Sequence, residues 1–471
     1  MIAAALAAAA LLAGCGGSSG GGAGATAQAK ITISSVKQYQ RIAGFGVSEG
    51  FGQAKALMSA PASVRQQVLS LLYSPTRGAG LTILRNEISA DAGFTIEPRA
   101  PSSPASKPSY LTLAEVDQDQ GQLWFARQIK AGYGTSVFAD AWSAPAFMKT
   151  NDSAINGGTV CGAPGASCKS GDWRQAYANY LVQYAKDYAA AGVPLSYVGP
   201  ENETTIAPPQ DSMIMSPAQT ANFMGILGAT LARSGLSTRA ECCASISWNY
   251  AQQFAAAIET DKAANTATAL FTSHGYFAAP DSPLRGWSKP VWETELAPFG
   301  FQPWDPAWDD GSLSSGFTWA QNIYTGLTAA NLDAFFYLWG ASTSGLTGPN
   351  TGLVEVEGNT VVTSGRLWAF AGYSRFVRPG AVRIGTTRSA TGLDVTAFRN
   401  SDGSIAVIVL NSARSRQVAA FSLGGLSGAH VTPYLTDTSR ELSAQSPITV
   451  RNSAFTAALP PRSLVTYDIR S

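Results

Sequence analysis

Residues 171–203 read GDWRQAYANYLVQYAKDYAAAGVPLSYVGPENE and contain one complete helix-then-strand unit. Within Trp173–Ala191, apolar and aromatic side chains recur at the spacing of one helix face. These side chains are Tyr177, Tyr180, Leu181, Tyr184 and Tyr188. Asp172 is a candidate N-cap, and Gly192 is of the residue type that ends helices. Pro194–Val198 then predicts a short buried strand, so the tyrosine stripe is interpreted as the core face of the helix; a sugar-binding platform is the alternative.

Short apolar strands separated by helical stretches recur on both sides of this unit. The candidates are Leu81–Leu84, Ser136–Ala139, Ala269–Thr272, Pro290–Trp292 and Asp333–Trp339. Such alternation is typical of parallel βα units. The predicted fold class of residues 31–375 is therefore α/β, a (β/α)₈ TIM barrel.

The sequence changes character after Arg375, where short strands follow one another at intervals of about ten residues. The candidates are Val382–Ile384, Leu393–Phe398, Ile405–Leu410, Val418–Leu423, Val431–Leu435 and Leu464–Ile469. Asp402-Gly403 indicates a tight hairpin turn between two of them. Residues 376–471 are thus predicted to form an antiparallel β-sandwich side domain, which the first strand or two of the chain can join.

The composition excludes several classes of protein. Only 13% of the 471 residues are charged, against about 25% in a typical soluble chain, whereas 45% are hydrophobic, which excludes a disordered chain. The 32 Lys and Arg are balanced by 31 Asp and Glu, so binding to a nucleic-acid backbone is not expected. The 11 Trp, 16 Tyr and 20 Phe favour a protein that presents aromatic rings to a neutral polar ligand such as a sugar.

The N-terminal residues predict export. Residues 1–12 form an apolar run far shorter than the roughly 20 residues that span a bilayer. Together with Leu12-Ala13-Gly14-Cys15, residues 1–15 resemble a bacterial lipoprotein signal, which implies a lipid anchor at Cys15. Residues 16–30, which begin with a Gly/Ser tract, are predicted to be a flexible tether. We expect a bacterial envelope protein anchored at the periplasmic or outer surface; the alternative is a soluble periplasmic or secreted protein.

Export permits disulfides among the remaining cysteines. Cys161 and Cys168 bracket a short loop and are predicted to form a local disulfide. The adjacent Cys242 and Cys243 form either a vicinal disulfide or two buried thiols. No spacing of Cys or of the two His suggests a metal site.

Polar and aromatic residues follow the predicted strands at the barrel end where active sites lie. The segments are Arg85-Asn86-Glu87, Asp140-Ala141-Trp142, Glu201-Asn202-Glu203, His274-Gly275-Tyr276, Glu293-Thr294-Glu295 and Trp339. Glycoside hydrolysis requires two carboxyl groups, one that protonates the leaving oxygen and one that attacks or activates water. Any one of these glutamates alone is more simply a structural ion-pair or capping residue, so the prediction depends on their combination.

Four motifs in chain order resemble glycoside hydrolase family 30, a family of retaining barrel enzymes. They are Gly44-Phe45-Gly46 after the first strand, the run from Trp142 to Lys149, Asn202-Glu203, and Trp292-Glu293-Thr294-Glu295. Residues 151–188, 316–324 and 366–382 are most similar to the fungal xylanases of subfamily 7. The resemblance extends from about residue 35 to the C-terminus.

This resemblance implies that Glu203 is the acid/base, Glu295 the nucleophile, and Asn202 a ligand of the substrate 2-hydroxyl. The residues alone do not choose within each segment, because Glu201 shares strand parity with Glu203, and Glu293 with Glu295. The Asn that precedes Glu203 favours Glu203. Glu201 is then expected to be a supporting or rim carboxylate, and Glu293 a barrel-core or ion-pair partner.

The resemblance also implies a set of substrate-binding residues. Arg85 and Asn86 resemble the floor and sugar-contacting residues of the family. Trp142, Tyr276 and Trp339 would stack on or edge the sugar, and His274 would orient the nucleophile. Ordinary barrel core for the aromatic rings, and a structural role for His274, are the alternatives.

Two departures from the family pattern are present, one in the loop after the acid/base and one that concerns the substrate. The usual Asn-Glu-Pro reads Asn202-Glu203-Thr204. Relatives specific for glucuronoxylan use an arginine near the first strand's loop, where this chain reads Glu49-Gly50-Phe51-Gly52-Gln53, with Lys55 nearby. Strict dependence on glucuronic acid branches is therefore not expected.

These observations lead to one main hypothesis and two alternatives. The first is a retaining hydrolase of β-1,4-xylan that works by double displacement, as an endo-xylanase or by releasing disaccharides. A family 30 enzyme acting on β-1,6-glucan or β-1,6-galactan is the second, and a non-catalytic carbohydrate-binding lipoprotein is the third. We expect no cofactor, no metal, no nucleic-acid partner and a monomer.

Overall fold

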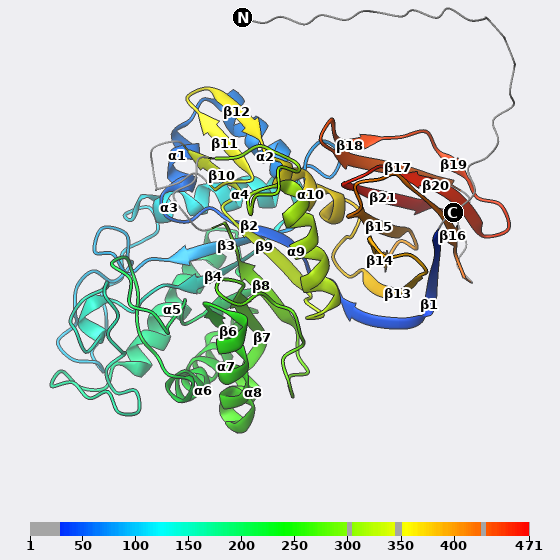
Figure 1. Ribbon diagram of the computed structural model, residues 1–471. Helices are drawn as coiled ribbons and strands as arrows, with labels where there is room; N and C mark the ends of the chain where they lie inside the picture. The colour runs from blue at the N-terminus through cyan, green and yellow to red at the C-terminus, as the bar shows by residue number, and fades with distance from the viewer. Residues whose placement is uncertain (1–28, 299–303, 344–350, 425–429, 471) are drawn as a thin grey trace, which may run out of the picture.

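Eight parallel strands close into a barrel in the computed structural model, which describes residues 29–298, 304–343, 351–424 and 430–470 (Figure 1). In barrel order they are β2 (Gly44–Ser48), β3 (Ile83–Ile88), β4 (Ser136–Ala141), β5 (Tyr197–Gly199), β6 (Arg239–Ser245), β7 (Thr268–His274), β8 (Val291–Glu295) and β9 (Ala334–Leu338). The predicted α/β barrel is confirmed. Cys15 and the predicted signal and lipoprotein site lie outside the described residues.

Helices connect the strands and cover the barrel (Figure 1). They are α1 (Gln53–Ser59), α2 (Ala62–Tyr73), α3 (Asp117–Gln120), α4 (Gln122–Tyr133), the 3₁₀ turn η1 (Ala146–Met148), α5 (Arg174–Ala190), α6 (Pro217–Ser234), α7 (Trp248–Thr260), α8 (Lys262–Ala267), α9 (Gly316–Thr328) and α10 (Gly365–Ser374). A small sheet of β10 (Ala341–Thr343), β11 (Val354–Glu357) and β12 (Thr360–Thr363) follows the last barrel strand.

Helix α5 has the predicted apolar face, and all five residues of the tyrosine-rich stripe are buried. The stripe is therefore core. The expectation that Asp172 is the N-cap is wrong: the helix begins at Arg174 with Trp173 as its N-cap. Asp172 instead accepts the backbone N–H of Arg174 and forms an ion pair with the side chain of the same residue.

The interior of the barrel is filled by large side chains that point inward from alternate strand positions. This inner core consists of Ile83, Phe138, Tyr197, Leu270, Trp292, Ala334 and Phe336. The inward parity of β3, which is set by Ile83, continues to Arg85 two residues later and places that side chain inside the barrel. The residues between them point outward to the helices.

Two barrel strands differ from the expectation. Gly44-Phe45-Gly46 follows the first strand of the chain (β1, Ala29–Arg41), as expected, and it forms the start of β2, which was not among the predicted strands. A Cβ at Gly46 would lie 2.1 Å from the ring of Phe336, its partner on the neighbouring strand β9, so the glycine leaves room for that ring inside the barrel. Strand β6 was not predicted, because its sequence RAECCAS lacks the run of large apolar residues that marks a buried strand.

The second domain is a β-sandwich, and its strands form one hydrogen-bonded series that includes the first strand of the chain (Figure 1). Its order is β18–β17–β21–β15–β14–β13–β1–β16–β20, with β19 paired to β17. The strands are β1 (Ala29–Arg41), β13 (Val382–Arg388), β14 (Leu393–Arg399), β15 (Ile405–Asn411), β16 (Gln417–Ser422), β17 (His430–Asp437), β18 (Arg440–Ala444), β19 (Ile448–Thr449), β20 (Ala454–Leu459) and β21 (Ser463–Arg470). Because β1 pairs with β13 and β16, the chain begins in this domain before it enters the barrel.

Helix α10 and the loop before α9 join the two domains. Thr466 on β21 donates to the carbonyl of Gly372 at 2.6 Å, and a Cβ at Gly372 would lie 2.4 Å from Leu464. Arg462 forms an ion pair with Asp309 at 2.6 Å. The side domain is thus fixed against the barrel by close packing as well as by polar contacts.

All four described cysteines are in disulfides. Cys161 and Cys168 close the loop before α5, with Cα atoms 5.5 Å apart. Cys242 and Cys243 on β6 form a vicinal disulfide, which decides between the two states that the sequence left open. Among the described residues, no helix combines the length and apolar character that crossing a bilayer requires.

Candidate active site

Arg85 lies at the centre of a polar cluster at the C-terminal end of the barrel strands. Its side chain is fully buried, and Nη2 donates to Oδ1 of Asn202 at 2.6 Å. Nε donates to Asp140 at 2.5 Å, and Nη1 forms an ion pair with Glu295. Burial disfavours the charge of Arg85, but the adjacent Asp140 and Glu295 carboxylates raise its pKa, so the guanidinium stays cationic.

Glu203 occupies the loop after β5 and contacts His274 from β7. Oε1 of Glu203 lies 2.8 Å from Nδ1 of His274. Burial raises the pKa of Glu203 from 4.5 to about 7, and the nearby Arg85 charge reduces this rise. Burial also lowers the pKa of His274 to about 4, so the imidazole is neutral at neutral pH. The expectation that His274 bonds the Glu295 carboxylate is wrong, because the hydrogen bond is made to Glu203.

Glu295 ends β8, and each of its two carboxylate oxygens is bound by another side chain. Arg85 contacts Oε2, and the hydroxyl of Tyr276 donates to Oε1 at 3.0 Å. Burial, followed by the charge of Glu295, raises the pKa of Tyr276 well above its usual value, so its hydroxyl keeps the proton that it donates. Both oxygens of Glu295 are thus oriented.

The two glutamates are close neighbours. One oxygen of Glu203, one oxygen of Glu295 and one nitrogen of His274 all lie within 4.8 Å of one another. The side chains of Glu203 and Glu295 keep 14% and 9% of their surface exposed, so a ligand can reach both. Three such donors could in principle hold a cation, but the Arg85 guanidinium already provides positive charge at Glu295. A second group, Glu201 with Cys242 and Cys243, offers no thiolate because the sulfurs are joined.

The neighbouring glutamates have structural roles. Glu201 is fully buried and accepts from the hydroxyl of Thr220 at 2.7 Å; burial raises its pKa to about 8. It is therefore not a rim carboxylate. Glu293 is also fully buried and accepts the backbone N–H of Glu295 at 2.9 Å and that of Phe336 at 3.2 Å. These contacts fix the backbone that presents Glu295.

Three aromatic rings lie beside the charged cluster. Trp142 packs over the Arg85 guanidinium, 4.5 Å from the ring centre. The ring of Phe51 lies edge-on to both Trp142 and Trp339, with centroid distances of 5.3 and 6.3 Å. The structure thus brings Trp142, Tyr276 and Trp339 to the site as expected, and adds Phe51. The sequence prediction did not include Phe51, because only the charged and polar residues of Glu49–Gln53 were considered as ligands; an aromatic residue in a barrel loop is a signal for a sugar-binding wall.

Asn86 is not brought to this cluster, which corrects the expectation that it contacts the sugar. It follows Arg85 on β3, so the alternation of side chains along a strand points it outward. There it is buried and donates to the hydroxyl of Tyr188 on α5 at 2.9 Å. Its role is to join strand and helix.

The loop after β2 contributes structure in place of a charged binding residue. The buried Glu49 accepts the backbone N–H of Ala341 at 2.8 Å, and Gln53 accepts that of Thr343 at 2.9 Å. Lys55 forms an exposed ion pair with Asp117 at 2.6 Å. Glu49 and Gln53 therefore anchor the small β10–β12 sheet, and Lys55 is engaged outside the cluster.

Comparison with known proteins supports the same family over both domains. Residues 28–279 match the model for O-Glycosyl hydrolase family 30, and residues 380–467 match the Glycosyl hydrolase family 30 beta sandwich domain. The catalytic domain of a family 30 xylanase C from Talaromyces cellulolyticus has a similar structure, with a TM-score of 0.88 and 43% identity over 94% of this chain and 100% of that chain. A family 30 subfamily 8 xylanase from Clostridium acetobutylicum shares the fold at 23% identity and a TM-score of 0.74, over 94% and 100% of the two chains.

Two curated relatives are more distant in sequence. The lysosomal acid glucosylceramidase of Mus musculus is 23% identical over 409 aligned positions, and the match covers 81% of this chain and 77% of that protein. The glucuronoxylanase XynC of Bacillus subtilis (strain 168) is 24% identical over 351 aligned positions, and the match covers 72% of this chain and 74% of that protein. The match of one family model to more than half of the chain, and of a second to its side domain, shows that the chain belongs to glycoside hydrolase family 30 and is a glycoside hydrolase.

Proposed function

We propose that the protein hydrolyses β-1,4-xylan with retention of configuration, with Glu203 as the acid/base and Glu295 as the nucleophile. The observation that carries this proposal is the pair of carboxyl groups with oxygens within 4.8 Å of each other. In retaining glycosidases the two carboxyl groups are about 5–5.5 Å apart, whereas inverting enzymes leave room for a water between them at about 6.5–9.5 Å.

The environments of the two glutamates fit different roles. Glu203 has a pKa raised by burial to about 7, as suits a group that first donates and later accepts a proton near neutral pH. Glu295 is ion-paired with Arg85 and accepts a hydrogen bond from Tyr276, and these contacts orient both of its oxygens, as suits a nucleophile.

The reaction proceeds in two displacements. Glu295 attacks the anomeric carbon while Glu203 protonates the departing glycosidic oxygen, and a covalent xylosyl–Glu295 intermediate forms. Glu203, now ionised, removes a proton from water, which attacks the same carbon and releases Glu295. A neutral His274 can accept at Nδ1 from protonated Glu203 or donate there to the ionised form, so its contact with Glu203 suits both steps.

Asn202 and the aromatic rings position the sugar in this scheme. The Oδ1 of Asn202 is held by Arg85, so the amide nitrogen is directed as a donor to the 2-hydroxyl. Trp142, Phe51 and Trp339 form the wall on which the apolar face of a xylose ring packs.

Xylan is proposed as the substrate because the Talaromyces cellulolyticus protein, 43% identical over nearly the whole chain, is a xylanase. Parallel product analysis on plain xylan, glucuronoxylan, β-1,6-glucan and β-1,6-galactan tests this, with Glu295→Gln as the inactive control. Xylo-oligosaccharides from both xylans are expected. Products only from a β-1,6-linked polymer would replace the substrate, and binding of xylo-oligosaccharide without any product would support the non-catalytic alternative.

We further propose that Cys15 carries a lipid that anchors the enzyme to a bacterial envelope as a monomer. The Leu12-Ala13-Gly14-Cys15 sequence and the Gly/Ser-rich residues that follow support this. Incorporation of a labelled fatty acid is expected and should be lost in Cys15→Ala. An unlabelled chain in the envelope or medium would indicate a soluble periplasmic or secreted enzyme.

A further inference from the structure

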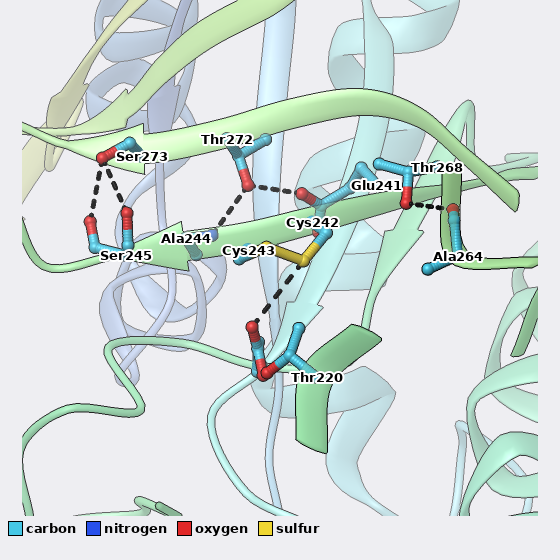
Figure 2. Close-up of a disulfide and its surroundings, with 11 residues drawn as sticks. Thr220, Glu241, Cys242, Cys243, Ala244, Ser245, Ala264, Thr268, Thr272 and Ser273 are labelled. Atoms are coloured by element: carbon cyan, nitrogen blue, oxygen red, sulfur yellow. Dashed lines mark hydrogen bonds between the residues drawn. A yellow bond between two sulfur atoms is a disulfide. The ribbon is translucent and has the colours of Figure 1, made fainter. Parts of the chain in front are cut away.

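A buried disulfide between two adjacent residues lies within β6, close to the proposed acid/base. Cys242 and Cys243 are 0% and 1% exposed. Figure 2 shows the sulfur bridge above Thr220 of α6, with Ala244 continuing the strand towards Ser245. A sulfur of Cys242 lies 3.7 Å from Oε1 of Glu201. The proposed mechanism uses neither sulfur.

Ala244, the residue after the disulfide, connects this ring to the catalytic glutamate. Its carbonyl accepts the backbone N–H of Glu203 at 2.9 Å. Its own N–H donates to Oγ1 of Thr272 at 2.8 Å, and the Thr272 hydroxyl donates to Oε2 of Glu241 at 2.5 Å (Figure 2). The backbone of Glu203 is thus held by one peptide unit of β6, which is in turn held from β7.

Both residues of this backbone contact have a conformation that L-amino acids rarely adopt. The φ angle is 44° at Ala244 and 50° at Glu203. Left-handed backbone at non-glycine residues persists only where the surroundings enforce it, and it concentrates at functional sites. Something must therefore keep Ala244 in this conformation, since no side-chain hydrogen bond of its own can.

A bond between the sulfurs of adjacent residues closes a small ring that contains the peptide bond joining them. Such a ring restricts ψ of Cys242 and φ of Cys243, and it thereby limits the directions from which the chain can approach Ala244. It also removes thiol protons, so the sulfur near Glu201 cannot donate to that carboxyl group. After reduction, a Cys242 thiol could donate to Oε1 of Glu201, and the backbone of β6 would gain rotational freedom.

We infer, building on the proposed function, that the Cys242–Cys243 disulfide is a positioning element for the acid/base: it holds Ala244 in its left-handed conformation, and Ala244 holds the backbone of Glu203. Reduction by a dithiol breaks the sulfur–sulfur bond, leaves two protonated thiols and converts the dithiol to its cyclic disulfide. The catalytic carboxyl group of Glu203 then loses its fixed orientation.

The first test is chemical. The native protein is denatured without reductant, alkylated and mapped by mass spectrometry. Unmodified Cys242 and Cys243 with the mass of a bridged peptide are expected. Alkylation of either residue in the unreduced protein would overturn the inference.

The second test compares Cys242→Ala/Cys243→Ala with Cys161→Ala/Cys168→Ala, which removes the other described disulfide. kcat/KM is measured on xylan and on an aryl β-xylobioside with an activated leaving group, which needs no acid. The first variant is expected to lose about tenfold or more on xylan but less than about twofold on the aryl substrate, as for partial loss of general acid catalysis, and to shift the alkaline limb of its pH profile. The control variant keeps both activities.

Equal losses on the two substrates, or no loss on xylan, would overturn the inference. If the first variant does not fold, the same two substrates are measured on the native protein reduced by a dithiol, with bridged and free thiols counted by mass spectrometry and with Cys161→Ala/Cys168→Ala as the background. A native enzyme inactive on both xylan and the aryl xylobioside would instead contradict the proposed function, so the two failures are distinguishable.

Discussion

Nδ1 of His274 lies 2.8 Å from Oε1 of Glu203, while Nε2 of the same ring lies 3.9 Å from Oε2 of Glu295. One imidazole therefore lies between the two carboxyl groups that we propose perform the reaction. Because burial lowers the pKa of His274 to about 4, this ring adds no positive charge near neutral pH. The positive charge of the site comes from Arg85, which contacts Glu295.

The pH dependence of xylan hydrolysis is expected to follow the titration of Glu203. The acid form is required for the first displacement, and burial raises its pKa to about 7, so kcat/KM on xylan is expected to fall about tenfold per pH unit above that value. An aryl xylobioside with an activated leaving group should lack this limb. Glu203→Ala should lose about a hundredfold to ten thousandfold on xylan and spare the aryl substrate. An alkaline limb that persists in Glu203→Ala would assign the acid to another residue.

Glu201 is expected to set the pH dependence of stability instead of activity. Its pKa is about 8 when folded and 4.5 in the reference state, so folding favours its protonated form. Below pH 4.5 this group does not alter stability; between pH 4.5 and 8 it destabilises the fold by about 1.4 kcal/mol for each pH unit. Glu201→Gln should therefore melt progressively higher than the native protein as pH rises, with xylan turnover retained. A constant difference in Tm from pH 4.5 to 8 would contradict this.

Gly199 on β5 leaves the space that the carboxyl groups of Asp140 and Glu241 occupy. A Cβ there would lie 1.4 Å from Oε1 of Glu241 and 2.5 Å from Oδ1 of Asp140. Burial, followed by the Asp140 charge, raises the pKa of Glu241 well above its usual range, so Glu241 retains a proton. Gly199→Ala should displace Asp140 from Arg85, lower kcat and cost about 1–3 kcal/mol of unfolding free energy.

The matched control for this substitution is Gly132→Ala on α4, where an added Cβ meets no atom within 4 Å. It is expected to be neutral or stabilising by up to about 1 kcal/mol, because alanine favours helix. Chemical denaturation measures the unfolding free energy of the two variants, and xylan turnover measures their kcat. Equal behaviour of both would show that the space at Gly199 is not what holds the pair.

Substitution of Phe51 tests whether the aromatic wall contributes to substrate binding. Phe51→Ala removes the ring that contacts Trp142 and Trp339, and KM for xylan is expected to rise several-fold, since one aromatic contact contributes about 0.5–1.5 kcal/mol. Phe51→Tyr retains the ring and should behave as the native enzyme. A fall in kcat with KM unchanged would show that Phe51 acts on the catalytic groups and not on substrate binding.

Sequence reasoning predicted what depends on local pattern. Apolar runs indicated most barrel strands, and the helical spacing of the tyrosines in residues 171–191 defined α5 to within one residue at each end. Strand β6 was not predicted because its buried residues are small or polar. Neighbouring strands bury these residues. The side-domain strands β18, β19 and β20 were not predicted because they are short and contain few large apolar residues.

The sequence predicted which strand ends form the site, but not which of its side chains contact one another. Arg85 and Asn86 are adjacent in sequence, yet the parity of β3 sends one into the barrel and the other to α5. Glu295 was expected as the partner of His274, but the partner is Glu203, because the φ angle of 50° at Glu203 turns that residue out of the regular strand path. Loop conformation of this kind depends on contacts such as that with Ala244, which no local pattern encodes.

The central claim is that Glu295 forms a covalent bond to the sugar. The most direct measurement is to inactivate the enzyme with a 2-fluoro xylobioside that carries an activated leaving group, and to map the labelled peptide by mass spectrometry. The account predicts one fluoro-xylobiosyl label per chain on Glu295, absent in Glu295→Gln, and retained anomeric configuration in the products of xylan. A label on Glu203, Glu201 or Glu293, or hydrolysis with inversion and no label, would contradict it.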